Sequence, residues 1–149
     1  MKKTLALITA LLLIGSGAEA KSRRRAPRKS PHLEITAIAV VESAPVRKRH
    51  SNGREFEELD VRLEVVRRTP ARGDDPDLPV DTAGLVHVVH DLSCGGVWVD
   101  VARGQRIELK GEYVHPTGEA RDLIHFTHPA TGACGRRGGH VGGYLRKVR

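Results

Sequence analysis

Histidine is the residue type in this chain with the widest chemical range, because an imidazole binds transition metals and exchanges protons near neutral pH. The eight histidines are His32, His50, His87, His90, His115, His125, His128 and His140. Two of them lie three residues apart in the segment His125-Phe126-Thr127-His128. Side chains three apart point to opposite faces of a regular strand, so His125 and His128 cannot bind one ion there. In such a strand His125 shares its face with Thr127 instead.

Two cysteines, Cys94 and Cys134, predict a constraint that gathers the scattered histidines. An isolated pair of cysteines in an oxidising compartment is typical of one disulfide. The bridge closes a loop of about 41 residues, which is worth about 4 kcal/mol in the chain-entropy model. A metal pair or a redox couple is the alternative, although the pair forms no Cys-x-x-Cys motif.

The same bridge predicts a candidate site. Cys94 follows an imidazole by four residues and a carboxylate by three, and Cys134 lies six residues from a histidine on either side. We therefore expect four side chains to be neighbours around the bridge: His90, Asp91, His128 and His140. This donor set suits zinc or another transition ion and also proton transfer. Structural hydrogen bonds at strand ends are the alternative interpretation.

Motifs of the common enzyme classes are absent from the sequence. It has no Gly-x-Ser-x-Gly nucleophile elbow, no Walker phosphate loop and no His-Glu-x-x-His zinc motif. The five aromatic residues are few for binding of single-stranded nucleic acid, which uses stacking platforms. The pattern therefore favours a non-enzymatic domain over an enzyme.

Residues 1–20 have the three parts of a secretory signal peptide. Two lysines precede the apolar run Leu5–Ile14, and an Ala-x-Ala cleavage site ends the segment. The run is too short for a membrane span, which needs about 20 apolar residues, and we expect no later transmembrane segment. We expect cleavage between Ala20 and Lys21 and a periplasmic or extracellular location.

The net charge of +7 belongs to a tail rather than to the predicted domain. The signal peptide contributes +1, residues 21–31 contribute +6, and residues 32–149 hold 17 basic and 17 acidic side chains. Residues 21–31 contain no large apolar side chain and two prolines, which predicts a basic disordered linker. Weak contact with anionic lipid, a polymer or nucleic acid is one interpretation of this linker. A solvated tether is the other.

Short strands must position the candidate site. Alternating or β-branched apolar residues predict extended segments. These are Leu33–Ser43, Phe56–Val66, Leu85–Asp91, Trp98–Val101, Ile107–Val114, Leu123–His128 and Tyr144–Val148. Asn52-Gly53 predicts a hairpin turn, Thr69–Gly84 a loop, and Gly111 a bulge or tight bend. No helical period exceeds two turns, so residues 32–149 are predicted to form one all-β domain, a small barrel or sandwich.

The second half of the chain resembles a family of small exported bacterial proteins, catalogued as domain of unknown function 3465. The resemblance rests on His90-Asp91-Leu92, Gly104-x-x-Ile107-x-Leu109-x-Gly111-Glu112-Tyr113, Ile124-His125-Phe126-Thr127-His128, and His140 before Gly143-Tyr144. It covers Val86 to Leu145, and the joint spacing of Gly-Glu-Tyr and Ile-His-x-Thr-His is its most specific part. Phe126 stands where the family usually has Trp, and Asp91 where it has Asn.

This resemblance implies a small OB-like β-barrel of five to six short strands, and it implies no activity. We expect an exported, non-enzymatic domain that binds an unknown ligand or protein partner. Its expected contact surface surrounds His90, Asp91, His125, Thr127, His128 and His140. Two alternatives stay open. One is a metal-dependent or histidine-based hydrolase acting on a phosphodiester; the other binds an anionic polymer or nucleic acid through the basic tail and the C-terminal arginines.

Overall fold

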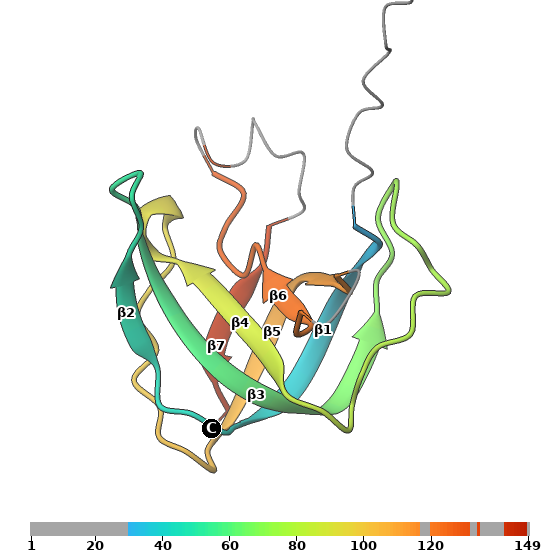
Figure 1. The fold of residues 1–149 in the computed structure, drawn as a ribbon, viewed down its shortest axis with the longest axis horizontal. Helices are drawn as coiled ribbons and strands as arrows, with labels where there is room; N and C mark the ends of the chain where they lie inside the picture. The colour runs from blue at the N-terminus through green and yellow to red at the C-terminus, as the bar shows by residue number, and fades with distance from the viewer. Residues whose placement is uncertain (1–29, 117–119, 132–133, 135–141, 149) are drawn as a thin grey trace, which may run out of the picture.

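The structure is a computed structural model that describes residues 30–148 apart from 117–119, 132–133 and 135–141. The predicted signal peptide, its cleavage site at Ala20 and Lys21, nearly all of the basic linker, and His140 lie outside these residues. The strands are β1 (His32–Val41), β2 (Val46–Arg49), β3 (Glu55–Arg68), β4 (Val86–Asp91), β5 (Arg106–Val114), β6 (Leu123–His125) and β7 (Tyr144–Lys147). One turn of 3₁₀ helix, η1 (Leu92–Cys94), follows β4 (Figure 1). Within this part of the chain, no helix has the length and apolarity that a membrane crossing needs.

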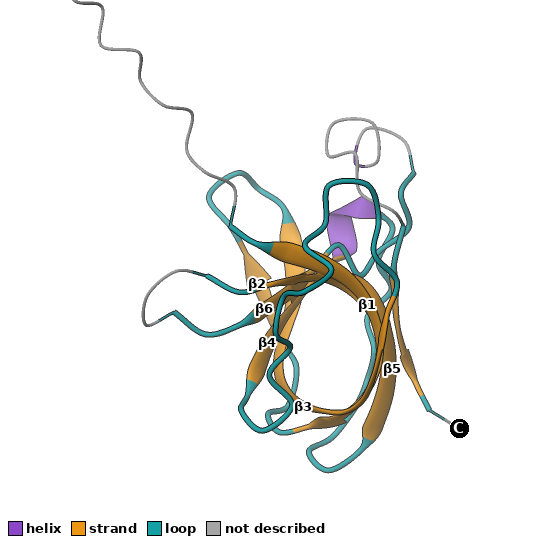
Figure 2. Ribbon diagram, turned by 90° about the vertical axis from the view of Figure 1, so that its right-hand side faces the viewer, coloured by secondary structure: helices purple, strands orange, loops and turns teal. Residues whose placement is uncertain are grey.

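Five of these strands close into a barrel, which Figure 2 shows as a ring. The order β1-β3-β4-β6-β5 returns to β1, because β1 pairs with both β3 and β5. The β4–β6 pair is parallel, whereas the other pairs in the ring are antiparallel. This order is that of an OB-like barrel, so the predicted all-β class is confirmed. Two further strands extend the ring: β2 pairs with β3, and β7 pairs with β5.

Alternation along the strands fills the barrel with aliphatic side chains. The odd-numbered residues of β1, from Leu33 to Val41, are buried, as are Leu59, Val61 and Leu63 of β3. Successive side chains of a strand point to opposite faces, so the even-numbered residues of β1, and those of β3 up to Arg62, face outward. Beyond the register shift the alternation in β3 reverses, because Val66 packs against the core and Val65 is exposed. Burial of these apolar side chains is the dominant stabilising contribution to such a fold.

Three segments differ from the predicted strands. Val46–Arg49 was not expected to be a strand, and it forms β2 with every residue exposed. It pairs with the start of β3 through the predicted Asn52-Gly53 turn, where Gly53 has a φ of 79°. The predicted segment 98–101 has no strand pairing, and the segment predicted to extend to residue 128 ends as β6 at His125.

The predicted bulge at Gly111 is wrong. The register between β1 and β5 runs without a shift along all of β5. Gly111 lies where β5 changes partner, from β7 at Lys110 to β6 at Glu112. A Cβ atom at this position would lie 2.5 Å from the carbonyl oxygen of His125, so the glycine permits the close approach of two strands. The register shift occurs instead between Ile38 and Ala39 in the β1–β3 pair.

The substitution Gly111→Ala is expected to lower the free energy of unfolding by about 2 kcal/mol, because overpacking a tight contact costs roughly 1–3 kcal/mol. The matched control is Gly53→Asn, at a turn where a Cβ meets no atom within 4 Å. Asparagine adopts the left-handed conformation readily, so this variant should stay within about 0.5 kcal/mol of the wild type. Urea denaturation of both variants measures the difference, and equal losses would contradict the contact at Gly111.

Candidate functional site

The disulfide predicted from the sequence joins two segments at one end of the barrel. Cys94 ends η1, and Cys134 lies in the segment that follows β6, with the two Cα atoms 5.8 Å apart. Asp91, Cys94 and His128 are buried beside this bridge, and one potential ligand atom of each lies within 4.8 Å of the others. The structure therefore brings together two of the four residues in the predicted cluster, Asp91 and His128. Of the other two, His90 points into the barrel and His140 lies outside the described residues.

Arg54, which was not among the residues predicted to form the cluster, holds Asp91 in place. Asp91 is the N-cap of η1, and its Oδ1 accepts a hydrogen bond from the Ser93 backbone amide at 2.9 Å. Its Oδ2 accepts from Nη2 of Arg54, and this nitrogen also lies 2.6 Å from the Sγ atom of Cys94. Arg54 comes from the β2–β3 hairpin, so only the pairing of β3 with β4 brings it to Asp91.

His90 points into the barrel and away from the outward face of Asp91, its neighbour in β4. Its side chain is 2 % exposed, and its Nδ1 lies 2.8 Å from Oγ1 of Thr127. Its Nε2 has no hydrogen-bond partner among the described residues, although the backbone of Val97 lies near enough to favour the protonated ring. Burial is the main reason that the pKa of His90 is lowered, and the charge of His128 adds to the shift. The ring is therefore neutral at pH 7.

The backbone at Phe126 changes the direction of the side chains that follow β6. Its φ of 54° is a left-handed conformation, found at no other non-glycine residue in the described ranges. Such a conformation is unusual for a bulky side chain and is concentrated at functional sites. Thr127 consequently turns inward onto His90, instead of sharing the face of His125 as a regular strand would require. His125 stays outside, with Nε2 3.0 Å from Oε1 of Glu112 and its ring stacked on Phe126.

A network of carboxylates and imidazoles covers the outer face of β3 and β4, and the sequence analysis missed it. Glu58 lies 2.5 Å from Nζ of Lys48, 3.2 Å from Nε2 of His50 and 3.3 Å from Nε2 of His87. Nδ1 of His87 lies 2.9 Å from Oδ1 of Asp60. Partial burial acts to raise the pKa of Glu58, but the hydrogen bonds from Lys48 and His50 lower it overall. Alternation with the buried Leu59 is the sequence signal that could have placed Glu58 and Asp60 on one outer face.

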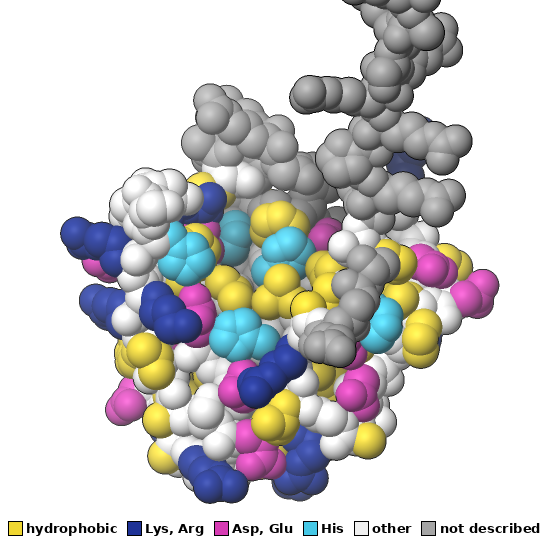
Figure 3. Space-filling view, in the orientation of Figure 1, with side chains coloured by type: hydrophobic (Ala, Val, Ile, Leu, Met, Phe, Trp, Pro, Cys, Tyr) yellow, Lys and Arg dark blue, Asp and Glu magenta, His cyan; other side chains and the backbone are white. Residues whose placement is uncertain are grey.

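Rings and apolar side chains lie beside this network. The ring centroids of His50 and Phe56 are 4.3 Å apart, and the guanidinium of Arg54 lies 5.6 Å from the Phe56 centroid. Figure 3 shows histidine and hydrophobic side chains gathered over β4 and β6, with basic side chains along the β2 edge. We call this surface the ring face and define it by His50, Arg54, Phe56, His87, Val89, Leu123, His125 and Phe126. It contains one residue of the predicted contact surface, His125.

A buried carboxylate inside the barrel was also missed. Glu57 lies directly opposite His90 in the β3–β4 register and is fully buried. Its two oxygens accept the backbone amide of Val99 at 3.0 and 3.2 Å. Burial raises the pKa of Glu57 to about 7, against the effect of the Val99 hydrogen bond and of the Arg47 charge. The odd-numbered pattern of Glu57, Leu59 and Val61 could have identified an inward carboxylate.

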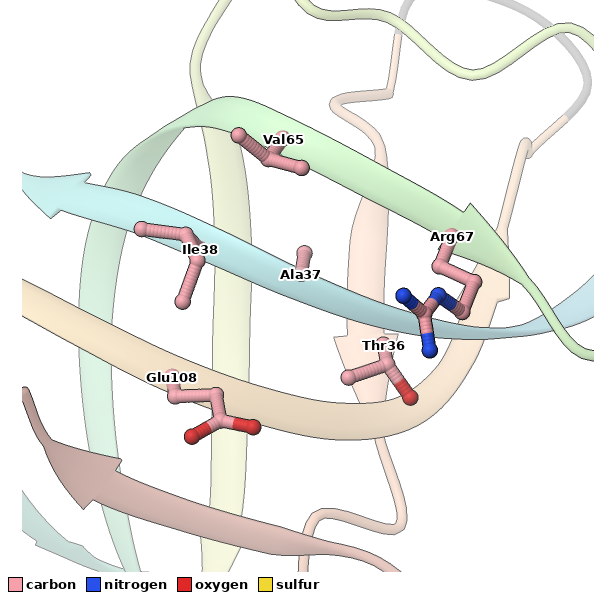
Figure 4. A pocket seen from close by; sticks show the side chains of 6 residues that line it. All are labelled: Thr36, Ala37, Ile38, Val65, Arg67 and Glu108. Carbon is pink, nitrogen blue, oxygen red and sulfur yellow. The ribbon is translucent and has the colours of Figure 1, made fainter.

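A shallow pocket of about 200 Å³ lies on another part of the barrel surface, between β1, β3 and β5 (Figure 4). It is lined by Thr36, Ala37, Ile38, Val65, Arg67 and Glu108. None of these residues belongs to the predicted contact surface or to the ring face, so this pocket does not coincide with the candidate site.

Glu57 should make the stability of the protein fall as the pH rises. The folded carboxyl has a pKa of about 7 against 4.5 in a solvated chain, so the folded state binds the proton more tightly. The free energy of unfolding should then decrease by about 2 kcal/mol between about pH 5 and about pH 8.5 through this group. Glu57→Gln keeps an oxygen for the Val99 amide but cannot ionise, and it should remove this decrease.

Urea denaturation at the two pH values measures the effect. The matched control is Glu55→Gln, at the same strand end, where hydrogen bonding to Arg49 lowers the pKa. That carboxylate is mostly ionised in both states at pH 5 and fully ionised at pH 8.5, so the control should keep nearly all of the wild-type decrease. An unchanged decrease in Glu57→Gln would show that another group carries the pH dependence.

The comparisons with known proteins do not extend this description. No protein-family model matches the chain, and no match was found among the curated proteins or among the solved structures. The resemblance to the exported bacterial family therefore stays a prediction.

Proposed function

We propose that the protein is an exported, non-enzymatic binding domain whose ring face holds an extended ligand with flat rings and negative charge. The observation that carries this proposal is the cluster of Arg54 and His50 against the ring of Phe56 on the outer face of β3, where the His50 and Phe56 rings are tilted by 38° to each other. In OB-like barrels, the corresponding strands and their loops are the usual binding surface for oligonucleotides and oligosaccharides. The predicted signal peptide is the support for export, and the disulfide is compatible with it.

The chemistry of the ring face suits such a ligand. Phe56 and Phe126 are partly exposed, and each lies against an imidazole ring. Bases and sugar rings stack on surfaces of this kind. Arg54 and Lys48 supply positive charge at one edge, and Glu58 repels an anion little because it is buried against Lys48 and two imidazoles.

A hydrolase is less well supported than a binding domain. Both oxygens of Asp91 are engaged, one by the Ser93 amide and the other by Arg54. His87 and His125 are each held by a carboxylate, and the Cys94 sulfur is part of the disulfide. These contacts give each group a structural role in the described part of the chain, which favours recognition over catalysis.

Anion binding through the C-terminal arginines also has less support than binding at the ring face. Arg146 lies 2.6 Å from Oε2 of Glu108, and its guanidinium stacks over Tyr144 at 4.7 Å. Its charge is paired with a carboxylate, as are those of Arg54 and Lys48, so charge alone does not distinguish the two surfaces. The ring face differs in its two phenylalanine rings, each of which lies against an imidazole. Residues 21–29, Arg136, Arg137 and Arg149 lie outside the described residues, so a contribution of the basic tail is tested separately below.

Phe56→Ala should weaken ligand binding by roughly 5- to 150-fold in Kd, because stacking of one ring is worth about 1–3 kcal/mol. Fluorescence anisotropy with a labelled single-stranded oligodeoxynucleotide and with a sulphated oligosaccharide measures the two affinities. Tyr144→Ala is the matched control, since this ring stacks on an arginine away from the ring face. It should bind each probe as the wild type does.

Deletion of residues 21–31 separates the tail from the ring face. The deletion should reduce the salt dependence of binding, because fewer counterions are released, and should leave the loss caused by Phe56→Ala unchanged. If the deletion abolishes binding while Phe56→Ala has no effect, the tail is the binding site and the proposal is wrong. If neither probe binds the wild type, a ring-bearing anionic ligand is excluded.

A further inference from the structure

We propose that Asp91, Cys94, His128 and Cys134 form a binding site for zinc or a similar divalent transition ion when the disulfide is reduced. This proposal does not depend on the ring face as a ligand surface. It also differs from the metal site predicted from the sequence, because His90 points into the barrel and two sulfur atoms take part.

Four potential metal donors converge at the disulfide. Asp91, Cys94 and His128 are all buried, and their potential ligand atoms lie within 4.8 Å of one another. Cys134 is bonded to Cys94, so its sulfur reaches the same place. Two sulfurs, one imidazole and one carboxylate form a four-donor set that zinc accepts in tetrahedral geometry. In the disulfide form the sulfurs are not thiolates, and only two of these four donors can bind a metal.

The imidazole of His128 is oriented by a backbone carbonyl. Nδ1 of His128 lies 3.0 Å from the carbonyl oxygen of Pro129, to which it can donate a hydrogen bond. Donation from one ring nitrogen to a backbone carbonyl is the usual arrangement for a histidine that binds metal through the other. The contact places the proton on Nδ1 and makes Nε2 the basic nitrogen.

Arg54 compensates the charge that the ligands would carry. Two thiolates and the Asp91 carboxylate carry three negative charges, and a divalent ion leaves one of them uncompensated. The guanidinium of Arg54 contacts both the Asp91 carboxylate and the Cys94 sulfur, and it supplies the remaining positive charge. Its side chain is 43 % exposed, so it can shift from Asp91 to make room for an ion and stay beside the sulfur.

Reduction requires a dithiol or an equivalent reductant. Its thiolate attacks the sulfur of Cys134, the less buried residue of the two. The S–S bond breaks, its electron pair passes to the Cys94 sulfur beside Arg54, and a mixed disulfide forms at Cys134. The second thiol of the reductant then displaces Cys134 and leaves as a cyclic disulfide. Binding of the ion releases the protons of both thiols to solvent.

Cobalt(II) titration of the purified protein tests the proposal, with Co²⁺ as a coloured substitute for zinc. The protein reduced with a phosphine under anaerobic conditions should bind one Co²⁺, with a thiolate-to-cobalt charge-transfer band and the visible bands of a tetrahedral ion. The disulfide form should show neither. This comparison uses one protein in two redox states and needs no variant.

Three substitutions then locate the ligands in the reduced protein. His128→Ala and Asp91→Asn should each weaken Co²⁺ binding by at least about tenfold, and asparagine still caps η1. His125→Ala is the matched control, because this imidazole lies on the outer face against Glu112 and should leave binding unchanged. Circular dichroism confirms that each variant is folded. Absence of the charge-transfer band in the reduced wild type would overturn the proposal, and so would equal affinity of His128→Ala and the wild type.

Discussion

The left-handed backbone at Phe126 is the constraint on which the arrangement of this end of the barrel depends. β6 ends at His125, directly before this residue, and the left-handed backbone sends consecutive side chains in different directions. His125 and Phe126 stay on the outer face, Thr127 enters the barrel to meet His90, and His128 reaches the disulfide. A residue with positive φ costs conformational energy. The contacts on both sides of the barrel wall offset that cost.

The barrel interior is polar at the end where its aliphatic core stops. Glu57 and His90 lie opposite each other where the aliphatic core ends. Glu57 accepts the Val99 amide, and Nδ1 of His90 lies against the Thr127 hydroxyl, while Nε2 of His90 has no hydrogen-bond partner among the described residues. Burial shifts their pKa values in opposite directions, raising that of Glu57 and lowering that of His90. Both shifts favour the neutral side chain, which is the form that a barrel interior tolerates best.

The sequence predicted those features that depend on local periodicity and missed those that depend on register. Alternation identified most of the barrel strands, and the isolated pair of cysteines in a chain predicted to be exported identified the disulfide that places Asp91 near His128. The prediction that this strand extends to residue 128 was wrong, because nothing in the local sequence requires a left-handed backbone at Phe126. The contact of Arg54 with Asp91 could not be predicted for a different reason. The two residues are 37 apart in the chain and meet only through the pairing of β3 with β4.

Arg54 also connects the two proposals physically. One face of its guanidinium lies over Phe56 of the ring face, while its nitrogen contacts the Asp91 carboxylate and the Cys94 sulfur. An anionic ligand that draws this side chain outward would free one oxygen of Asp91, and an ion bound there would release Arg54 from that carboxylate. Both ligands act on the position of one side chain, so their binding is coupled, and the coupling is equal in both directions. Reduction of the disulfide, which creates the metal site, would therefore change ligand binding at the ring face through a single arginine rather than through a change of fold.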